Sequence, residues 1–236
     1  MSGDSTSSFR VNGRDSALLK LLHDAAHGVF PPASFETTHL PSPSSPTDAV
    51  LAFFGHHIIA SDVDPEFVSR WTREDPFALS DVRFLAALAV ELGSKPGIYD
   101  AVFAAIGQGT EPGEAGMTET DDRTHSRVVR ALTYRDPTSV RSFRDRSGLG
   151  LLVMGRGLAG RMEAAYEVGP DARGQGIGRR LITAARLLAP VNEPVFLQIS
   201  PGNVWSMKAL AGQPEWLPVG SELLFLRESS PHDALD

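Results

Sequence analysis

The sequence predicts an α/β protein built on one mixed β-sheet, with helices on both faces. Two patterns favour this class. Four short strand candidates follow one another closely between residues 128 and 168, a spacing typical of antiparallel meanders. Helical and strand patterns then alternate between residues 176 and 227, as they do in α/β sheets. At 236 residues, 42% of them hydrophobic, the chain has the length for one enlarged domain or two small ones.

The composition and charge exclude several classes of protein. A net charge of −7 at pH 7 argues against binding to nucleic acid or to an anionic membrane. The chain has no cysteine, which excludes a disulfide framework, a thiolate metal site and a cysteine nucleophile. No spacing of histidine, aspartate and glutamate resembles a metal site. The N-terminal stretch lacks the apolar core of a signal peptide, and the longest apolar runs fall far short of the ~20 residues that span a membrane, so we expect a soluble cytoplasmic protein.

The first part of the chain is predicted to be a disordered tail at residues 1–15, followed by an N-terminal α/β extension or degenerate second lobe at residues 16–106. Apolar residues at helical or alternating spacing, interrupted by glycine and proline, mark its elements. In chain order these are a helix that starts at Ser16 and ends at Gly28, a short strand at residues 35–40, a hairpin or bulged strand split by Gly55 at residues 49–63, helices capped by Asp64 and Ser80, and a short helix at residues 98–106.

Residues 107–125 are acidic and rich in glycine, which predicts a mobile connector and a domain boundary. The domain after it spans residues 126–228, and a tail follows at residues 229–236. The predicted elements of this domain are strands at residues 128–135, 140–146, 149–155 and 161–168, a helix at residues 176–188, a strand at residues 195–199, a helix at residues 204–211 and a final strand near residues 219–227.

The most informative stretch lies between residues 166 and 188, where a strand stops at Pro170 and a glycine-rich loop opens a helix. Alternating glycines remove the side chains that would keep a ligand from the backbone, and the free N–H groups of a helix's first turn carry roughly half a positive charge. Arginines add further positive charge. The loop and the helix start contain Arg173, Gly174, Gly176, Gly178, Arg179 and Arg180. Together these features predict a site for an anion, most naturally a phosphate or pyrophosphate.

Other interpretations of the loop are plainer or fit less well. A glycine-rich turn before a helix is often only a tight connection. The dinucleotide fingerprint requires G-x-G-x-x-G, whereas this loop has G-x-G-x-G with Arg179 in place of the third glycine. A Walker loop ends in G-K-[ST], and this loop has no lysine. Both phosphate-loop alternatives therefore fail on spacing or chemistry.

A different pattern fits in register: Arg/Gln-x-x-Gly-x-Gly/Ala, after a strand that ends in valine and a turn that contains proline. The residues that occupy it are Val168, Pro170, Arg173, Gly176 and Gly178. This stretch resembles the acetyl-CoA loop of the GNAT superfamily of N-acetyltransferases. Residues 194–210 are similar to that superfamily's next strand and helix, and the resemblance extends over residues 161–226. It implies a GNAT-like acyl-CoA N-acyltransferase fold, in which the cofactor is wedged where two central strands splay apart.

The resemblance also implies which residues would hold acetyl-CoA as co-substrate. Backbone groups of Glu167 and Val168 would face the pantetheine arm and the acetyl end. Asn203, which stands where the family often places an asparagine, would reach the pantetheine or the thiol. The pyrophosphate would be held by Gly174, Gln175, Gly176 and Gly178, with Arg173 and Arg179 adding charge.

The acid and base that many members of the family use are missing from this chain. Leu210 occupies the position where many members carry a tyrosine acid, and Gln198 and Met162 occupy two positions where some members carry a glutamate base. Tyr166 is a candidate for a displaced acid, and Glu163 would enter the base position through a bulge. The plainer interpretations are that Tyr166 packs with its hydroxyl satisfied and that Glu163 lies on a solvated or salt-bridged edge.

The sequence therefore predicts an N-acetyltransferase that moves acetyl from acetyl-CoA to a primary amine by direct transfer. The acceptor would be a small molecule or a peptide; neither nucleic acid nor membrane is an expected partner, and a homodimer is compatible with the sequence. Either His56 or His57 would suit a base or a proton relay, but not both, because adjacent strand residues point in opposite directions; a surface position is the commoner explanation. The alternative function is a non-catalytic module that binds CoA or acetyl-CoA and acts through a protein partner. The departures at Leu210 and Gln198 favour this alternative.

Overall fold

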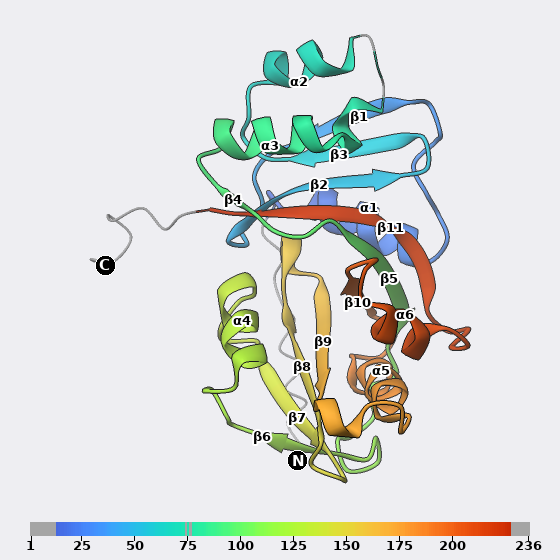
Figure 1. Ribbon diagram of the computed structural model, residues 1–236. Coiled ribbons are helices and arrows are strands. Elements are labelled where there is room, and N and C mark those ends of the chain that lie inside the picture. The colour runs from blue at the N-terminus through green and yellow to red at the C-terminus, as the bar shows by residue number, and fades with distance from the viewer. Residues whose placement is uncertain (1–12, 74, 76, 228–236) are drawn as a thin grey trace, which may run out of the picture.

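The computed structural model describes residues 13–73, 75 and 77–227 (Figure 1). The tail predicted at residues 229–236, and most of the one predicted at residues 1–15, lie outside the described residues. Within the latter, residues 13–15 form a turn into the first helix. Asp15 is buried there, and its carboxylate accepts a hydrogen bond from the Ser44 N–H at 2.8 Å, so this end of the predicted tail packs against the fold.

One mixed sheet runs through the described part of the chain, which confirms the predicted fold class. Its order is β1-β3-β2-β11-β5-β10-β9-β8-β7-β6, with the short β4 beside β11. The pairs β1–β3 and β9–β10 are parallel, and the other neighbours are antiparallel. The strands are β1 (Glu36–Leu40), β2 (Thr47–Phe53), β3 (His56–Ala60), β4 (Lys95–Pro96), β5 (Asp100–Ile106), β6 (Met117–Thr120), β7 (Arg141–Asp145), β8 (Gly150–Arg156), β9 (Met162–Val168), β10 (Pro194–Ile199) and β11 (Leu217–Leu226).

Helices cover both faces of the sheet, because successive strand residues point to opposite faces. On β2, Leu51 packs in a cluster with α1, whereas Val50 packs with α2 and α3. On β8, Leu151 packs with α4 and Leu152 with α5. Among the described helices none is long and apolar enough to cross a membrane. The helices are α1 (Ser16–Ala26), α2 (Pro65–Thr72), α3 (Val82–Glu91), α4 (Ser126–Tyr134), α5 (Ile177–Leu188) and α6 (Val204–Leu210), with single 3₁₀ turns at Ala78–Ser80, Leu158–Gly160 and Pro170–Ala172.

The two halves of the chain share this sheet by exchanging strands (Figure 1). β5, from the N-terminal half, lies between β10 and β11 of the C-terminal half and pairs with both. β11 lies in turn between β5 and β2. The prediction of a helix at residues 98–106 is therefore wrong. A short, buried apolar run cannot be distinguished from a buried helical segment by periodicity alone, and the partners that define β5 are distant in the sequence.

A second correction concerns residues 128–135, which were expected to form a strand; residues 128–134 instead belong to α4, and Arg135 follows the helix. Val128 and Ala131 face the core at helical spacing, and Nδ1 of His125 accepts the Arg127 N–H at 3.1 Å as an N-cap. The adjacent valines in this segment favour a strand on propensity, and packing against β8 overrides that preference.

Local turn and cap chemistry decides two details of the first half. Of the two predicted forms of residues 49–63, the structure has the hairpin, with Gly55 at its turn at a φ of +66°. Helix α3 is capped by Asp81 and not by Ser80, the predicted cap. The Asp81 carboxylate accepts the Arg83 N–H at 2.7 Å, one residue later than expected.

Residues 107–125, predicted as a mobile connector, are hydrogen-bonded to the rest of the fold, both to α5 with the loop that follows it and to the sheet. The Gly107 N–H donates to the carbonyl oxygen of Glu193 at 2.8 Å. Residues Met117–Thr120 form the edge strand β6, which pairs with β7. The polar composition of this short strand concealed it in the sequence, because only its first residue is apolar and buried.

Replacing Gly107 with alanine is expected to lower the free energy of unfolding by about 1–3 kcal/mol, as overpacking does. The added Cβ would lie 2.7 Å from the carbonyl oxygen of Ala189, a backbone atom that cannot turn aside. Gly113→Ala is the control in the same segment, because nothing lies within 4 Å of its added Cβ. Urea denaturation of both variants measures the difference, and equal stability would contradict close packing at Gly107.

Candidate functional site

The site is organised around the point where β9 and β10 separate. These parallel strands pair from Val195↔Met162 to Leu197↔Ala164, where their register ends. Past Ala164, β9 stays paired with β8 as far as Val168, so the opposite edge of its backbone has no strand partner there. Such an edge offers N–H and C=O groups to an extended ligand. The splay that the resemblance implied is therefore present.

The glycine loop follows β9 and opens α5 beside this splay. Gly174 and Gly176 have φ values of +77° and +75°, in the left-handed region that favours glycine. The N–H groups in the first turn of a helix have no intrahelical acceptor. Gly176, the N-cap of α5, has no side chain that could accept a hydrogen bond from them. At Gly178 an added Cβ would lie 3.4 Å from Ala209 Cβ and 3.5 Å from Tyr166 Cε2, so the third glycine lets α6 and β9 approach the helix.

A cavity of about 500 Å³ lies between the loop, the end of β9, and helices α5 and α6; it is called the first cavity below. This volume lies in the range of about 300–1,000 Å³ that is usual for ligand pockets. The charged residues that line the cavity are mostly basic. They are Arg127, Arg173, Arg179 and Lys208, together with one acidic residue, Glu167. A basic cavity in a protein of net charge −7 is complementary to an anionic ligand.

The first cavity gathers the residues that the resemblance assigned to acetyl-CoA, apart from Gln175. They are Glu167, Val168, Arg173, Gly174, Gly176, Gly178, Arg179 and Asn203. Gln175 turns back onto its own loop, where its side chain donates to the carbonyl oxygen of Asp171 at 3.3 Å. The structure brings these residues together as expected, and their contact with a ligand stays a prediction.

Two of these side chains already have partners within the protein. The side-chain oxygen of Asn203 caps α6 by accepting the Ser206 N–H at 3.1 Å, so a ligand would meet the amide nitrogen of Asn203. The carboxylate of Glu167 lies 3.4 Å from Nε of Arg127. This ion pair removes one basic side chain from the charge available to an anion, and it leaves the backbone of Glu167 as its predicted contact.

A second cavity, of about 470 Å³, adjoins the first on the side of α4. The residues that line both are Arg127, Tyr166, Glu167, Asn203 and Ser206. The polar residues that line only the second cavity are Asp100, Ser126, Arg130, Tyr134, Arg135, Glu163, Gln198 and Ser200. They come from β5, β9, the splayed end of β10, and α4 with the residue that follows it, which are distant in the sequence. One end of a ligand in the first cavity would therefore face the polar side chains of the second cavity.

Tyr166 lies where the two cavities meet. Its hydroxyl is buried and makes no well-formed hydrogen bond with a described residue, although the side chain of Ser206 lies close to it. Burial raises the pKa of Tyr166 above its ordinary value of 10.0, although Ser206 and Arg127 nearby act against the shift. Nε2 of Gln198, which lines the second cavity, is likewise buried without a partner. Buried polar groups are nearly always hydrogen-bonded, so unsatisfied groups in two adjoining cavities favour a ligand that satisfies them.

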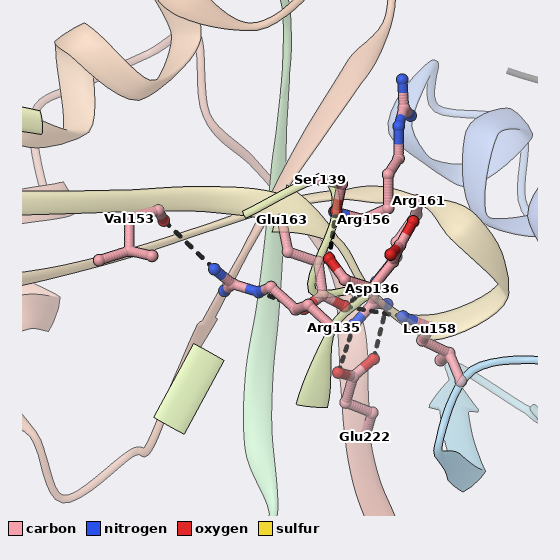
Figure 2. A network of polar contacts seen from close by, with 9 residues as sticks. All are labelled: Arg135, Asp136, Ser139, Val153, Arg156, Leu158, Arg161, Glu163 and Glu222. Carbon is pink, nitrogen blue, oxygen red and sulfur yellow. Dashed lines mark hydrogen bonds and ion pairs between the residues drawn. The ribbon is translucent and has the colours of Figure 1, made fainter. Parts of the chain in front are cut away.

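Glu163, the second candidate catalytic residue, belongs to a buried ion network (Figure 2). Its carboxylate accepts hydrogen bonds from Nε of Arg161 at 2.9 Å, Nε of Arg135 at 3.2 Å and the Leu158 N–H at 3.2 Å. Burial alone would raise the pKa of Glu163, but the two guanidinium groups outweigh it and lower that pKa. A carboxylate paired twice and held ionised is a weak base, so the geometry favours the salt-bridged interpretation of this residue.

The same network reaches β11 through Arg161, whose side chain is 0% exposed. Its Nη1 and Nη2 donate to the Glu222 carboxylate at 2.7 and 2.5 Å (Figure 2). Burial acts to lower the pKa of Arg161, and the carboxylates of Glu222 and Glu163 raise it on balance. The guanidinium lies 5.1 Å from the ring centroid of Phe196 on β10, so this side chain crosses the sheet between β9 and β11.

Asp100, the first residue of β5, is the candidate that sequence reasoning missed. It lines the second cavity, and burial raises its pKa to about 6 with help from the Glu222 carboxylate and against the charge of Arg130. A carboxyl group that titrates near neutrality in a polar cavity is a candidate for acid–base chemistry. No local pattern marks it, because its surroundings are created by the distant partners of β5.

The histidine pair and Leu210 lie apart from this chemistry. His56 and His57 are buried, line neither cavity, and place their Nε2 atoms 2.9 Å from the hydroxyls of Thr38 and Ser80, respectively. Burial, assisted by His56, lowers the pKa of His57. Leu210 packs in the core with α5. In the part of the chain that the structure describes, no group of three or more His, Asp or Glu side chains could hold a metal ion.

No protein-family model and no curated protein matches the chain. Among solved structures it is similar to an acetyltransferase of the GNAT family from Colwellia psychrerythraea, at 12% identity and a TM-score of 0.36 over 62% of this chain and 63% of that one. A GCN5-related N-acetyltransferase from Kribbella flavida is similar at 17% identity and a TM-score of 0.36 over 63% and 66%. A conserved protein of unknown function from Staphylococcus epidermidis is similar at 13% identity and a TM-score of 0.36 over 69% and 79%. The chain thus spans just under two thirds of the first two proteins, which carry the family name expected from the sequence.

Proposed function

We propose that this protein is a GNAT-like N-acetyltransferase that moves the acetyl group of acetyl-CoA directly to a primary amine. One observation carries the proposal: the uncapped, glycine-lined start of α5 opens onto a basic cavity at the splay of β9 and β10. A helix N-terminus with free N–H groups binds phosphate through both hydrogen bonds and its dipole. The unpaired edge of β9 lies beside this helix N-terminus. The two features together suit a ligand that has a diphosphate and a long arm containing amides.

Each part of the first cavity has a task in binding. Acetyl-CoA would supply the activated acetyl group as a thioester. The loop at Gly174 and Gly176, with the first-turn N–H groups of α5, binds the diphosphate, and Arg173 adds a charge-assisted contact. The free edge of β9 up to Val168 binds the arm and directs it toward the junction of the two cavities. Fixing both reactants in one geometry provides much of the rate enhancement of a transfer reaction.

Tyr166 is the proposed acid in this reaction. The amine nitrogen forms a bond to the carbonyl carbon while the carbon–sulfur bond breaks. The Tyr166 hydroxyl gives its proton to the departing sulfur, and the proton that the nitrogen loses restores the hydroxyl. The pKa of Tyr166 lies above its ordinary value of 10.0, so the hydroxyl is protonated at neutral pH, as an acid requires. Backbone N–H groups near Val168 stabilise the negative charge that develops on the carbonyl oxygen.

The non-catalytic alternative is favoured by two features. Leu210, which is only 7% exposed and belongs to the core, cannot donate a proton, and Gln198 is an amide where some members of the family carry a glutamate base. Calorimetry with CoA and acetyl-CoA, run beside an acetylation assay across a panel of primary amines, separates the two functions. We expect both binding and an acetylated product. Binding without transfer to any amine would support the module that acts through a partner, and absence of CoA binding would contradict both functions.

A further inference from the structure

The charged residues that line the second cavity differ in whether they are already paired. They are Asp100, Arg127, Arg130, Arg135, Glu163 and Glu167. Arg127 lies 3.4 Å from Glu167, and Arg135 lies 3.2 Å from Glu163. Among the described residues, neither Asp100 nor Arg130 has an ion-pair partner within 4.0 Å. One negative and one positive side chain are thus left for a ligand.

Asp100 lies beside a carboxylate that is already committed. It is the register partner of Glu222 on β11, and Glu222 accepts both terminal nitrogens of Arg161. The groups that bear on its charge are Glu222 from β11 and Arg130 from α4, apart from its own burial. A carboxylate placed next to another carboxylate is stabilised by a cationic ligand, such as an ammonium group, and readily accepts its proton.

Arg130 provides the opposite charge from α4. Its guanidinium lies 4.9 Å from the ring centroid of Tyr134, another residue that lines the second cavity, and its side chain is otherwise exposed. An arginine held against an aromatic ring keeps its planar donors available for a carboxylate or phosphate. A polycationic acceptor would meet repulsion here, and a neutral amine would leave Arg130 unused.

We infer that the second cavity binds an acceptor amine that also carries an anionic group, as amino acids do, with Asp100 receiving the amine and Arg130 the anion. The inference rests on the proposed acetyltransferase function and names its substrate class. Asp100 takes one proton from the bound ammonium group, which frees the nitrogen to attack the thioester, and it later releases that proton to solvent. As the carbon–sulfur bond breaks, Tyr166 gives its proton to the departing sulfur, and the second proton of the attacking nitrogen restores the Tyr166 hydroxyl, so the protons and charges balance.

The test compares α-amino acids with their own amides as acceptors, using the full chain and acetyl-CoA. The acids are expected to have a kcat/KM at least tenfold higher than the amides, mainly through KM. Arg130→Gln should remove this preference and leave the amides unchanged. Arg141→Gln is the control, because Arg141 is an exposed arginine paired with Glu119 and lines neither cavity.

The outcomes separate this inference from the proposed function. Transfer to amines with no preference for the acids, or an Arg130→Gln variant that affects acids and amides equally, would overturn the inference and leave the acetyltransferase function in place. Transfer to no amine at all would overturn both. A preference for acids that Arg130→Gln removes supports the assignment.

Asp100→Asn tests the other half of the assignment. It is expected to lower kcat by about 10²-fold or more and to remove an inflection near pH 6 from the pH–rate profile, with acetyl-CoA affinity unchanged. A kcat within twofold of the native value, or an inflection that survives the substitution, would overturn the role of Asp100.

Thermal unfolding of the same variant gives a readout that does not depend on turnover. The pKa of Asp100 is raised from 3.8 to about 6 in the folded protein, so its contribution to stability is greatest below pH 3.8 and is lost as the pH rises to about 6. The Tm of Asp100→Asn relative to the native protein should therefore rise across that window and stay level above it. A difference in Tm that does not change with pH would contradict the perturbed carboxyl group.

Discussion

Replacing Glu222 with glutamine is expected to lower the free energy of unfolding by about 3–5 kcal/mol, the cost of removing one partner of a buried ion pair. Arg161, 0% exposed, would lose a partner bound at 2.7 and 2.5 Å and retain its charge in the core. Urea denaturation measures the effect. The loss should appear in the midpoint at unchanged slope, because the native fold is retained.

A matched control is available on the surface. Glu119 also accepts two hydrogen bonds from one arginine, at 2.7 Å from both Nε and Nη2 of Arg141, but the side chains of Glu119 and Arg141 are 47% and 55% exposed. Glu119→Gln should therefore lower the free energy of unfolding by no more than about 1 kcal/mol. If both variants lost a similarly small free energy of unfolding, water or another group would have to compensate the charge of Arg161. That result would contradict the buried network in Figure 2.

Replacing Tyr166 with phenylalanine is expected to lower kcat by about 10²–10⁴-fold, the usual contribution of a general acid. Affinity for acetyl-CoA should not change, because the ring that packs near Gly178 is retained. Stability should be equal or slightly higher, since the variant removes a buried hydroxyl without a partner. This combination distinguishes a role in proton transfer from one in packing.

The remaining tyrosines of the chain provide controls for this experiment. Tyr134 lines only the second cavity, and Tyr99 lines neither and exchanges a 2.8 Å hydrogen bond with Ser221. Tyr134→Phe and Tyr99→Phe should each retain kcat within a few-fold of the native value. If Tyr166→Phe were as active as these two variants, the acid would have to be sought elsewhere, and water would be the first candidate.

The part of the site that holds the cofactor could be predicted because it is local in sequence. Strand, turn, glycine loop and helix follow one another between residues 166 and 188, and each carries its own pattern of glycine, proline or helical periodicity. Of the residues that the resemblance assigned to the cofactor, only Asn203 is contributed from farther along the chain, where it begins the next helix. Such a local motif can be recognised in the sequence without knowing how the rest of the chain packs.

The acceptor side could not be predicted because tertiary pairing creates it. Asp100 lines the second cavity only because β5 inserts between β10 and β11. No pattern in the residues near Asp100 in the sequence predicts that pairing. Residues 128–134, expected to form a strand, belong to the helix that carries Arg130. The position of Arg130 at the second cavity could therefore not be predicted either. Propensity and periodicity describe neighbours along the chain, whereas burial between distant strands decides both cases.

Calorimetric titration of CoA into the full chain tests most directly whether the start of α5 holds the diphosphate. The native protein should bind CoA, and Gly176→Glu should weaken binding by more than tenfold, because a like charge at ~4 Å costs about 1 kcal/mol in water and about 4 kcal/mol near a protein surface. Gly28→Glu carries the same charge at nearly the same φ, +78° against +75°, with nothing within 4 Å of its added Cβ, and it should bind CoA as the native chain does. Unchanged affinity in Gly176→Glu, or no binding by the native protein, would contradict a coenzyme A site at this helix.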